Sequence, residues 1–207
     1  MIWTDRTEAG RTLASKVVGD GIRASLVLGL ARGGVVVGQE VARALDVPLD
    51  VFIVRKIGAP GRPEDAIGAV APGMTYLNDA LIAQLGIGRR YIDLTIEEET
   101  RQMDRQLAKF RGGRTPLVRD KAVMLVDDGV ATGTTAATAI DWARARGARR
   151  VLLAVPVCGP EGAALLREKA DMLIYLAMPE DFSTVGSCYA DYSPVSDSEI
   201  SRLVQRR

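Results

Sequence analysis

Residues 123–136 have the sequence VMLVDDGVATGTTA: an apolar run, an acidic pair, a loop of small residues and the start of a helix. The run Val123–Val126 is short and continuous, which is typical of a strand buried on both faces of a sheet. Two glycines in the loop allow tight turns of the backbone. Because ligands bind at the carboxyl ends of the strands in a parallel α/β sheet, this segment is predicted to carry a binding site.

The rest of the chain alternates short apolar runs with helical patterns. Strands are predicted over Ser25–Leu30, Leu49–Val54, Ala122–Val126, Val151–Val157 and Met172–Leu176. Helices are predicted over Asp5–Val18, Val35–Leu45, Thr134–Arg146 and Glu161–Lys169, with a short last helix near Ser196–Val204. This alternation indicates an α/β fold, in which a central, mostly parallel sheet is flanked by helices.

A long insertion, residues 56–121, interrupts this alternation between the second and third strands. Its glycines and prolines predict a loop over Gly58–Asp65. A hairpin is predicted next, pairing Ala66–Val70 with Met74–Leu77, followed by a long charged helix over Arg89–Lys109. An insertion of this length in a compact domain is usually functional or forms a partner surface.

Length and charge set the broad class of the protein. A chain of 207 residues can bury one substantial core, so residues 1–207 are expected to form a single domain. Its C-terminal segment, residues 178–207, is polar and is expected to be loop-like up to the short last helix. The 27 Lys and Arg residues are balanced by 26 Asp and Glu residues, which gives no reason to expect a nucleic-acid partner. No apolar run approaches the length of a membrane span, and the N-terminus lacks a signal-peptide pattern, so no membrane partner is expected.

The chain contains no histidine, which excludes Ser-His-Asp hydrolases, Cys-His proteases and histidine-ligated zinc sites. Cys158 and Cys188 are far apart and lack the spacing of a metal site, which favours reduced thiols in a cytoplasmic protein. Any chemistry must therefore use carboxylates, Lys, Arg, hydroxyls, backbone amides or a metal held by oxygen.

The acidic pair and the loop after it point to a phosphorylated sugar as ligand. Amides and hydroxyls at Ala131–Thr135 would lie at a helix N-terminus, which favours a phosphate. Asp127 and Asp128 would repel a bare phosphate, so they need hydroxyl groups or a cation to face; a ribose diol and Mg²⁺ meet that need. The Lys of a Walker loop and the G-x-G-x-x-G fingerprint are both missing. The alternative is that the aspartates cap a turn and the threonines cap a helix.

Val126–Thr135 resembles the signature of type I phosphoribosyltransferases that bind 5-phosphoribosyl-1-pyrophosphate (PRPP): an apolar strand, two acidic residues and a T-G-[GTK]-[ST] loop. The resemblance implies a type I phosphoribosyltransferase-like fold with a small C-terminal hood. It implies that Asp127 and Asp128 hold the ribose 2- and 3-hydroxyls and Mg²⁺, the metal directly or indirectly. It also implies a 5-phosphate cradle formed by Ala131, Thr132, Gly133, Thr134 and Thr135.

Two further segments fit the same resemblance. Ala31, Arg32, Gly33 and Gly34 follow the first strand, where the family has its pyrophosphate-binding loop, often with a non-proline cis peptide; the Ala31–Arg32 bond is the candidate. Lys56 matches a lysine that many members place near the pyrophosphate. The alternatives are an ordinary strand-to-helix turn and a solvated cation at a strand end.

The resemblance also predicts a lid and an acceptor site. Gly58–Asp65 lies where the family has a flexible loop that closes over PRPP, and Met178–Tyr192 lies in the position of the hood. Phe182, Val185 and Tyr189 are the hood residues expected to contact the acceptor, unless they pack the hood on the core.

One departure from the family pattern bears on the acceptor. Members that act on 6-oxopurines commonly carry a carboxylate where this chain has Ala131, which weakens a hypoxanthine or guanine assignment. The long Arg89–Lys109 helix resembles a subgroup of the family with no settled acceptor.

The resulting prediction is a glycosyltransferase of nucleotide metabolism that transfers the 5-phosphoribosyl group of PRPP to a nitrogenous base or related acceptor and releases pyrophosphate. Asp127, Asp128, Lys56 and Arg32 are the predicted catalytic residues. The sequence does not identify a general base; Glu64 or Asp65, in the expected lid, could serve as one. A cytoplasmic homodimer is expected.

Two other functions stay open. A regulatory protein of the same fold could sense PRPP or a nucleotide without catalysis. A phosphohydrolase could hold Mg²⁺ on adjacent aspartates, although the pattern D-x-D is not present at Asp127–Gly129.

Overall fold

The structure is a computed structural model that describes residues 2–205, except for the side chains of Pro63, Glu64 and Gln205. Its centre is a parallel sheet of five strands in the order β2-β1-β6-β7-β8. The strands are β1 (Leu26–Leu30), β2 (Leu49–Phe52), β6 (Ala122–Val126), β7 (Arg150–Val157) and β8 (Met172–Ala177). Each of the five predicted strands is present, and the expected parallel α/β fold is confirmed.

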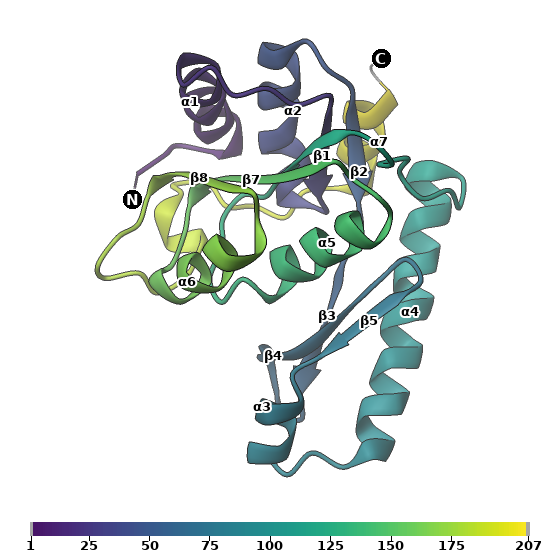
Figure 1. Ribbon diagram of the computed structural model, residues 1–207. Coiled ribbons are helices and arrows are strands. Elements are labelled where there is room, and N and C mark those ends of the chain that lie inside the picture. The colour runs from purple at the N-terminus through teal and green to yellow at the C-terminus, as the bar shows by residue number, and fades with distance from the viewer. Residues whose placement is uncertain (1, 206–207) are drawn as a thin grey trace.

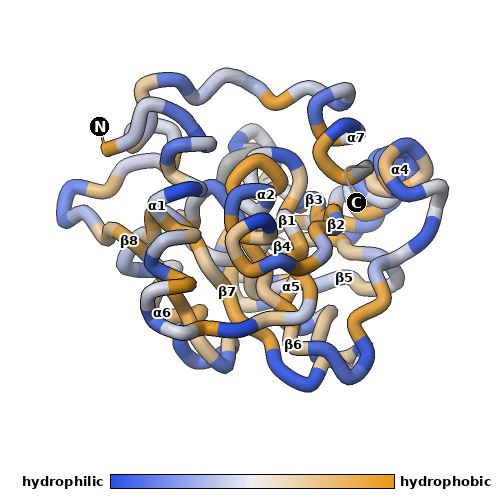
Figure 2. The backbone as a smooth tube through the Cα atoms, turned by 90° about the horizontal axis from the view of Figure 1, so that it is seen from above, coloured by the Kyte–Doolittle hydropathy of each residue, from blue (hydrophilic) through white to orange (hydrophobic). Residues whose placement is uncertain are grey.

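Helices cover both faces of this sheet (Figure 1). One face carries α1 (Arg6–Gly19) and α2 (Gly33–Leu45), and the other carries α5 (Thr134–Ala145) and α6 (Pro160–Lys169). Successive strand residues point to opposite layers, so that Met124 packs with α1 and α2 while Leu125 packs with α5. Figure 2 shows the resulting apolar strands inside a more hydrophilic outline.

The insertion folds into an arm that projects away from the body (Figure 1). It contains an antiparallel sheet of β3 (Arg55–Ala59), β4 (Arg62–Ala71) and β5 (Met74–Leu77), followed by α3 (Asp79–Gln84) and α4 (Arg89–Arg111). The sheet packs on α4 around a small core of its own. The predicted pairing of β4 with β5 is present.

Two details of the insertion differ from prediction. Gly58–Asp65 is not an open loop, because most of it lies in β3 and β4, and Gly61 turns the chain between them at a φ of 71°. The short helix α3 was not predicted; Asn78 caps it by accepting a hydrogen bond from the Leu81 amide at 3.0 Å.

The arm is fixed to the body near its base. The indole of Trp142 in α5 donates to the Pro72 carbonyl at 2.9 Å, and its ring lies 4.4 Å from the Phe52 ring. At the C-terminal end of α4, where the helix returns to the body, Arg111 donates two hydrogen bonds to the Asp50 carboxylate, of 2.7 and 2.6 Å. These contacts hold β3, and therefore Lys56, in a defined position beside the sheet.

The C-terminal segment returns over the carboxyl edge of the sheet. It contains one turn of 3-10 helix at Gly186–Cys188 and ends in α7 (Asp197–Gln205), which packs against α2 and α4. Tyr189 pairs with Trp3 near the N-terminus, so the beginning of the chain and its C-terminal segment meet at this edge. Within residues 2–205, no helix has the length and apolar character of a membrane span.

Candidate functional site

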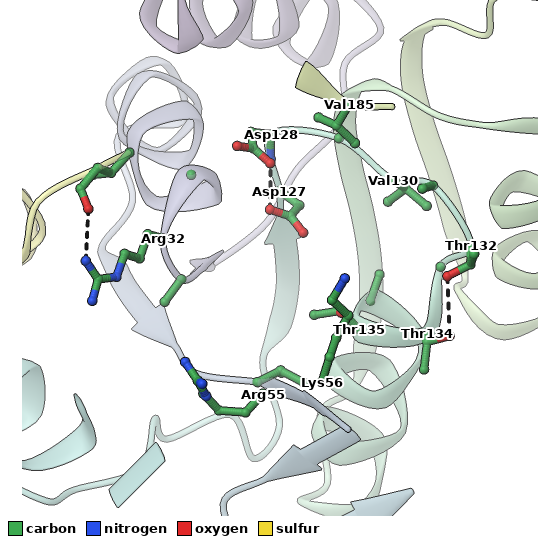
Figure 3. A pocket seen from close by; sticks show the side chains of 18 of the residues that line it. Arg32, Arg55, Lys56, Asp127, Asp128, Val130, Thr132, Thr134, Thr135 and Val185 are labelled. Carbon is green, nitrogen blue, oxygen red and sulfur yellow. Dashed lines mark hydrogen bonds between the residues drawn. The ribbon is translucent and has the colours of Figure 1, made fainter. Parts of the chain in front are cut away.

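A cavity of about 580 Å³ opens at the carboxyl edge of the central sheet. The loops after β1 and β6, the start of β3, the beginning of α1 and the C-terminal segment all contribute to its wall (Figure 3). The predicted site residues that line it are Ala31, Arg32, Gly33, Lys56, Asp127, Asp128, Ala131, Thr132, Gly133, Thr134, Thr135 and Val185. Segments far apart in the sequence therefore meet in one cavity.

The loop between β6 and α5 presents unpaired amides to this cavity. In the described part of the chain, the N–H groups of Ala131–Ala136 donate to no carbonyl or side chain. Helix α5 begins at Thr134, and Gly133 precedes it at a φ of 87°. The Ala131 carbonyl instead accepts a hydrogen bond from Gly162 of α6, at 3.1 Å. Free amides at a helix N-terminus form a binding site for an anion such as phosphate.

The loop after β1 presents a second set of amides. Its Ala31–Arg32 peptide is cis, and Ala31 is anchored by a hydrogen bond from its amide to the Phe52 carbonyl at 2.9 Å. Among the hydrogen bonds of residues 2–205, none uses the amides of Arg32, Gly33 or Gly34 as donor. These amides lie at the N-terminus of α2, so this loop can also bind an anion.

Gly33 and Gly34 allow this loop to pack directly on the end of β6. A Cβ on Gly33 would lie 1.8 Å from Oδ2 of Asp128, and one on Gly34 would lie 2.4 Å from the Val126 carbonyl oxygen. A larger residue at Gly34 would force the two loops apart, and one at Gly33 would displace either its loop or the Asp128 side chain. Gly34 does not line the cavity itself, so its position supports the loop from behind.

Asp127 and Asp128 each have one carboxylate oxygen engaged. Oδ1 of Asp127 accepts a hydrogen bond from the Asp128 amide at 2.9 Å, and Oδ2 of Asp128 accepts one from Nε of Arg6 at 2.7 Å. Oδ2 of Asp127 accepts no hydrogen bond from the residues described here, and the Tyr192 hydroxyl lies close to the Asp128 carboxylate. Removal from water, together with the charge of Asp128, raises the pKa of Asp127.

Arg6 and Tyr192 are site residues that the sequence did not reveal. The Arg6 guanidinium lies 4.0 Å from the centre of the Tyr192 ring, and this ring stacks on Tyr189 at 5.4 Å. Burial, and next the charge of Asp128, raise the pKa of Tyr192. No local pattern marks Arg6, because its contact with Asp128 joins residues 122 positions apart.

Lys56 extends from the beginning of β3 into the cavity, towards Thr135 (Figure 3). Its ammonium group forms no ion pair with a residue of the described range, whereas the neighbouring Arg55 is held by Glu99 at 2.7 Å. Lys56 is therefore available to a negatively charged ligand.

The Arg32 side chain points from its loop to the C-terminal segment. It donates to the Val195 carbonyl at 3.1 Å and lies 2.8 Å from the Asp197 carboxylate. Arg32, which was predicted to bind pyrophosphate, thus lines the cavity, but its guanidinium binds Val195 and Asp197 of the C-terminal segment.

The three predicted acceptor residues occupy different positions. Val185 lines the cavity and packs on Gly129, where a Cβ would lie 2.5 Å from one of its methyl groups. Phe182 packs against Gly159, and the Tyr189 hydroxyl donates to the Asp128 carbonyl, so both support the wall from behind. Tyr192 is the aromatic side chain of this segment that faces the cavity.

The remaining predictions concern proton transfer and metal binding. Asp65 lies in β4, 3.2 Å from Arg62, and does not line the cavity; the Glu64 side chain is outside the described residues. The described residues contain no cluster of three metal-binding side chains. Asp127 and Asp128 alone could hold a cation here, with the other ligands supplied by a substrate or water.

Known proteins share this architecture. A family model described as phosphoribosyl transferase domain matches residues 3–192. The chain is 38% identical over 207 residues to "Putative phosphoribosyl transferase Rv0571c" and to "Putative phosphoribosyl transferase MT0597", from two strains of Mycobacterium tuberculosis. The match covers 99% of this chain and 47% of each relative, so the chain spans about half the length of these relatives.

Two solved structures extend the comparison. TT1426 from Thermus thermophilus is 38% identical, with a TM-score of 0.81 and coverage of 99% of this chain and 98% of that chain. A hypothetical protein from Neisseria gonorrhoeae, solved with bound ppGpp, has a TM-score of 0.53 at 13% identity, covering 99% of this chain and 95% of that one. The second comparison shows the shared fold alone.

Proposed function

The chain belongs to the phosphoribosyltransferase family, and from this we propose that it binds PRPP with Mg²⁺ and transfers the 5-phosphoribosyl group to a nitrogenous base or related acceptor, releasing pyrophosphate. One observation carries the proposal. The unpaired amides of Ala131–Ala136 lie beside two carboxylates that each keep one oxygen free. Such a pairing suits a ligand with a phosphate at one end and vicinal hydroxyls next to it.

The cavity offers a place for each part of PRPP. The 5-phosphate would accept hydrogen bonds from the amides and hydroxyls of Ala131–Thr135. The two ribose hydroxyls would donate to the free oxygens of Asp127 and Asp128. The pyrophosphate would lie against the amides of Arg32–Gly34, with Lys56 as the nearby cation that has no carboxylate partner in residues 2–205.

Mg²⁺ fits this arrangement only together with the substrate. Asp127 and Asp128 would supply oxygen ligands directly or through water, and pyrophosphate oxygens and water would complete the set. When bound, the ion would neutralise part of the pyrophosphate charge.

Catalysis would rest on positioning and on charge. As the bond between C1 of the ribose and the pyrophosphate oxygen breaks, C1 becomes positive and the electron pair leaves with the pyrophosphate. Lys56 and the amides of the Arg32–Gly34 loop stabilise that leaving charge, while the aspartates and the phosphate loop hold the sugar. The acceptor nitrogen then forms the new bond to C1 and loses its proton. No carboxylate of the described residues other than Asp127 and Asp128 lines the cavity, so we assign that proton to bulk water.

The proposed acceptor side of the cavity, around Ala131, Val185 and Tyr192, has, among the described residues, no carboxylate besides the two aspartates. Ala131 has no group that can exchange a proton with a purine ring, while Val185 and Tyr192 offer apolar and aromatic surface. Adenine-like, pyrimidine and non-base acceptors remain the preferred candidates. We also propose a cytoplasmic homodimer, whose state sedimentation equilibrium would measure.

Calorimetric titration with PRPP tests the binding site, and pyrophosphate release across a panel of bases tests the reaction. We expect micromolar binding in the presence of Mg²⁺, on the order of −8 kcal/mol. The Asp127→Asn/Asp128→Asn variant should lose most of it. A wild-type protein that binds no PRPP would refute the proposal.

A non-catalytic PRPP or nucleotide sensor is the second candidate. The engagement of Arg32 by Asp197 favours it, because a guanidinium is withdrawn from the pyrophosphate loop. Tight PRPP binding without pyrophosphate release, whichever acceptor is offered, would select the sensor.

A further inference from the structure

Arg6 joins three parts of the site at one guanidinium group. Its Nε donates to Oδ2 of Asp128 at 2.7 Å, and its Nη1 donates to the Ser193 carbonyl at 2.9 Å. Its planar group also lies over the Tyr192 ring, 4.0 Å from the centre. Helix α1, the end of β6 and the C-terminal segment therefore meet at this side chain.

The contact between Arg6 and Asp128 is one of two well-buried ion pairs among the described residues; the other, Arg111 with Asp50, lies outside the cavity. The side chains of Arg6 and Asp128 are only 11% and 10% exposed, whereas most of the other pairs are far more open to solvent. Exposed ion pairs contribute little, but removal of one partner from a buried pair leaves an uncompensated charge. The pair is also enclosed on its remaining side, since a Cβ on Gly33 would lie within 2.7 Å of Nε of Arg6.

This enclosure fixes the direction of the Asp128 carboxylate. With Oδ2 held by Arg6, only Oδ1 is available to a ligand. Asp127 is fixed differently, because the Asp128 amide holds its Oδ1. The site thus offers two free oxygens, one from each residue, but only Asp128 depends on a distant side chain for its orientation.

We propose that Arg6 is a positioning residue that aims Asp128 at one ribose hydroxyl and so makes the site select ribose phosphates over deoxyribose phosphates. The proposal rests on the proposed function, because it assumes that a sugar phosphate occupies the cavity. Without Arg6 the Asp128 side chain can rotate or bind water, and the hydroxyl that it meets loses its acceptor. The other hydroxyl keeps Asp127.

Binding of three simple probes measures this selectivity: ribose 5-phosphate, 2-deoxyribose 5-phosphate and 3-deoxyribose 5-phosphate, each titrated by calorimetry. Loss of a hydrogen bond to a carboxylate should weaken binding about tenfold. We expect the wild-type protein to bind ribose 5-phosphate about tenfold more tightly than each deoxy sugar.

Arg6→Ala should lose the preference against only one of the two deoxy sugars, to within about twofold, and keep the preference against the other. Arg6→Lys, which keeps a cation, should give an intermediate ratio, and ethylguanidinium should partly restore the ratio of Arg6→Ala. Arg11→Ala is the matched control, because Arg11 lies on the same helix with an exposed side chain, 3.5 Å from Glu40 and outside the cavity. It should behave like the wild type.

The outcomes separate this proposal from the one before it. If the wild type binds PRPP and discriminates between the probes, but a folded Arg6→Ala variant discriminates equally well, the role of Arg6 is refuted and the proposed function stands. If Arg6→Ala does not fold, a wild-type ratio in Arg6→Lys together with Arg6→Gln leads to the same conclusion. If the wild type binds neither PRPP nor any probe, both proposals fail.

Discussion

Arg32 and Asp197 form an ion pair of 2.8 Å that joins the loop after β1 to the first turn of α7. Oδ1 of Asp197, the atom in this contact, accepts no hydrogen bond, so the attraction is one of charge. Oδ2 of Asp197 accepts a hydrogen bond from Lys109 at 2.7 Å. That bond, and the charge of Arg32, hold the pKa of Asp197 below its usual value. The C-terminal helix thus keeps Arg32 turned away from the amides beside it.

Asp197→Asn should release Arg32 towards the cavity. Because an ion pair near the protein surface contributes about 0.2–1 kcal/mol, we expect pyrophosphate to bind up to roughly fivefold more tightly to the variant. Calorimetric titration with pyrophosphate measures the change. Asp141→Asn is a suitable control, since it removes a comparable surface pair, with Lys169 at 2.7 Å, away from the cavity. Weaker binding by Asp197→Asn would show that the ion pair holds the loop in its binding conformation.

Gly33→Ala should disturb the contact between the loop after β1 and Asp128. Its Cβ would lie 1.8 Å from Oδ2 of Asp128, so the loop after β1 or the aspartate must move. Such overpacking typically costs about 1–3 kcal/mol of stability, and we expect PRPP affinity to fall by about tenfold or more. Gly19→Ala is the control, because a Cβ there meets no atom within 4 Å. Urea denaturation and PRPP titration of both variants check the prediction, which fails if Gly33→Ala binds PRPP like the wild type.

Lys56→Ala should affect one end of the ligand only. Lys56 has no carboxylate partner in the described range and extends into the cavity (Figure 3). A charge-assisted hydrogen bond contributes about 1.5–3 kcal/mol, so pyrophosphate binding should weaken roughly tenfold or more. Ribose 5-phosphate, which lacks the pyrophosphate, should bind within about twofold of the wild type. Lys16→Ala, an exposed lysine paired with Asp20 on α1, provides the control. An equal loss for both ligands would place Lys56 at the 5-phosphate or in a purely structural role.

The sequence was sufficient for the parts of the site that lie close together along the chain. The apolar run Ala122–Val126, the two aspartates and the small-residue loop occur in one local segment, and each belongs to a pattern with a direct physical meaning. The strands and helices of the body were predictable for the same reason, with bounds that differ by a few residues.

Other parts could not be predicted, because they depend on tertiary contacts. Arg6 reaches Asp128 only after α1 has packed on the sheet, and Tyr192 reaches Arg6 only after the C-terminal segment has crossed the carboxyl edge. The direction of Arg32 likewise depends on where α7 packs. Gly61 is visible in the sequence, but a glycine can either end a strand or form the turn of a hairpin. Only the pairing of β4 with β3 shows that Gly61 forms a hairpin turn.

The two aspartates should have opposite effects on stability. Removal from water, and then the charge of Asp128, raise the pKa of Asp127 well above its ordinary value. A carboxyl with a higher pKa in the folded than in the unfolded chain takes up a proton on folding between the two values. The free energy of unfolding therefore falls as the pH rises from about 4 to the raised pKa of Asp127, and remains lower above it.

Asp127→Asn should abolish this penalty, because the amide cannot ionise but keeps the Oδ1 acceptor that the Asp128 amide uses. At pH 7 the variant should be more stable than the wild type, by on the order of 1 kcal/mol, and the difference should vanish below about pH 4. Asp128→Asn should instead be less stable at pH 7, because it leaves the buried Arg6 without its anionic partner. Urea denaturation between about pH 4 and pH 8 measures both differences. If Asp127→Asn is less stable than the wild type at pH 7, the Asp127 carboxylate is stabilised in the folded chain and its charge imposes no cost. The expected order would show that the fold gives up stability at neutral pH to keep the Asp127 carboxyl group facing the cavity.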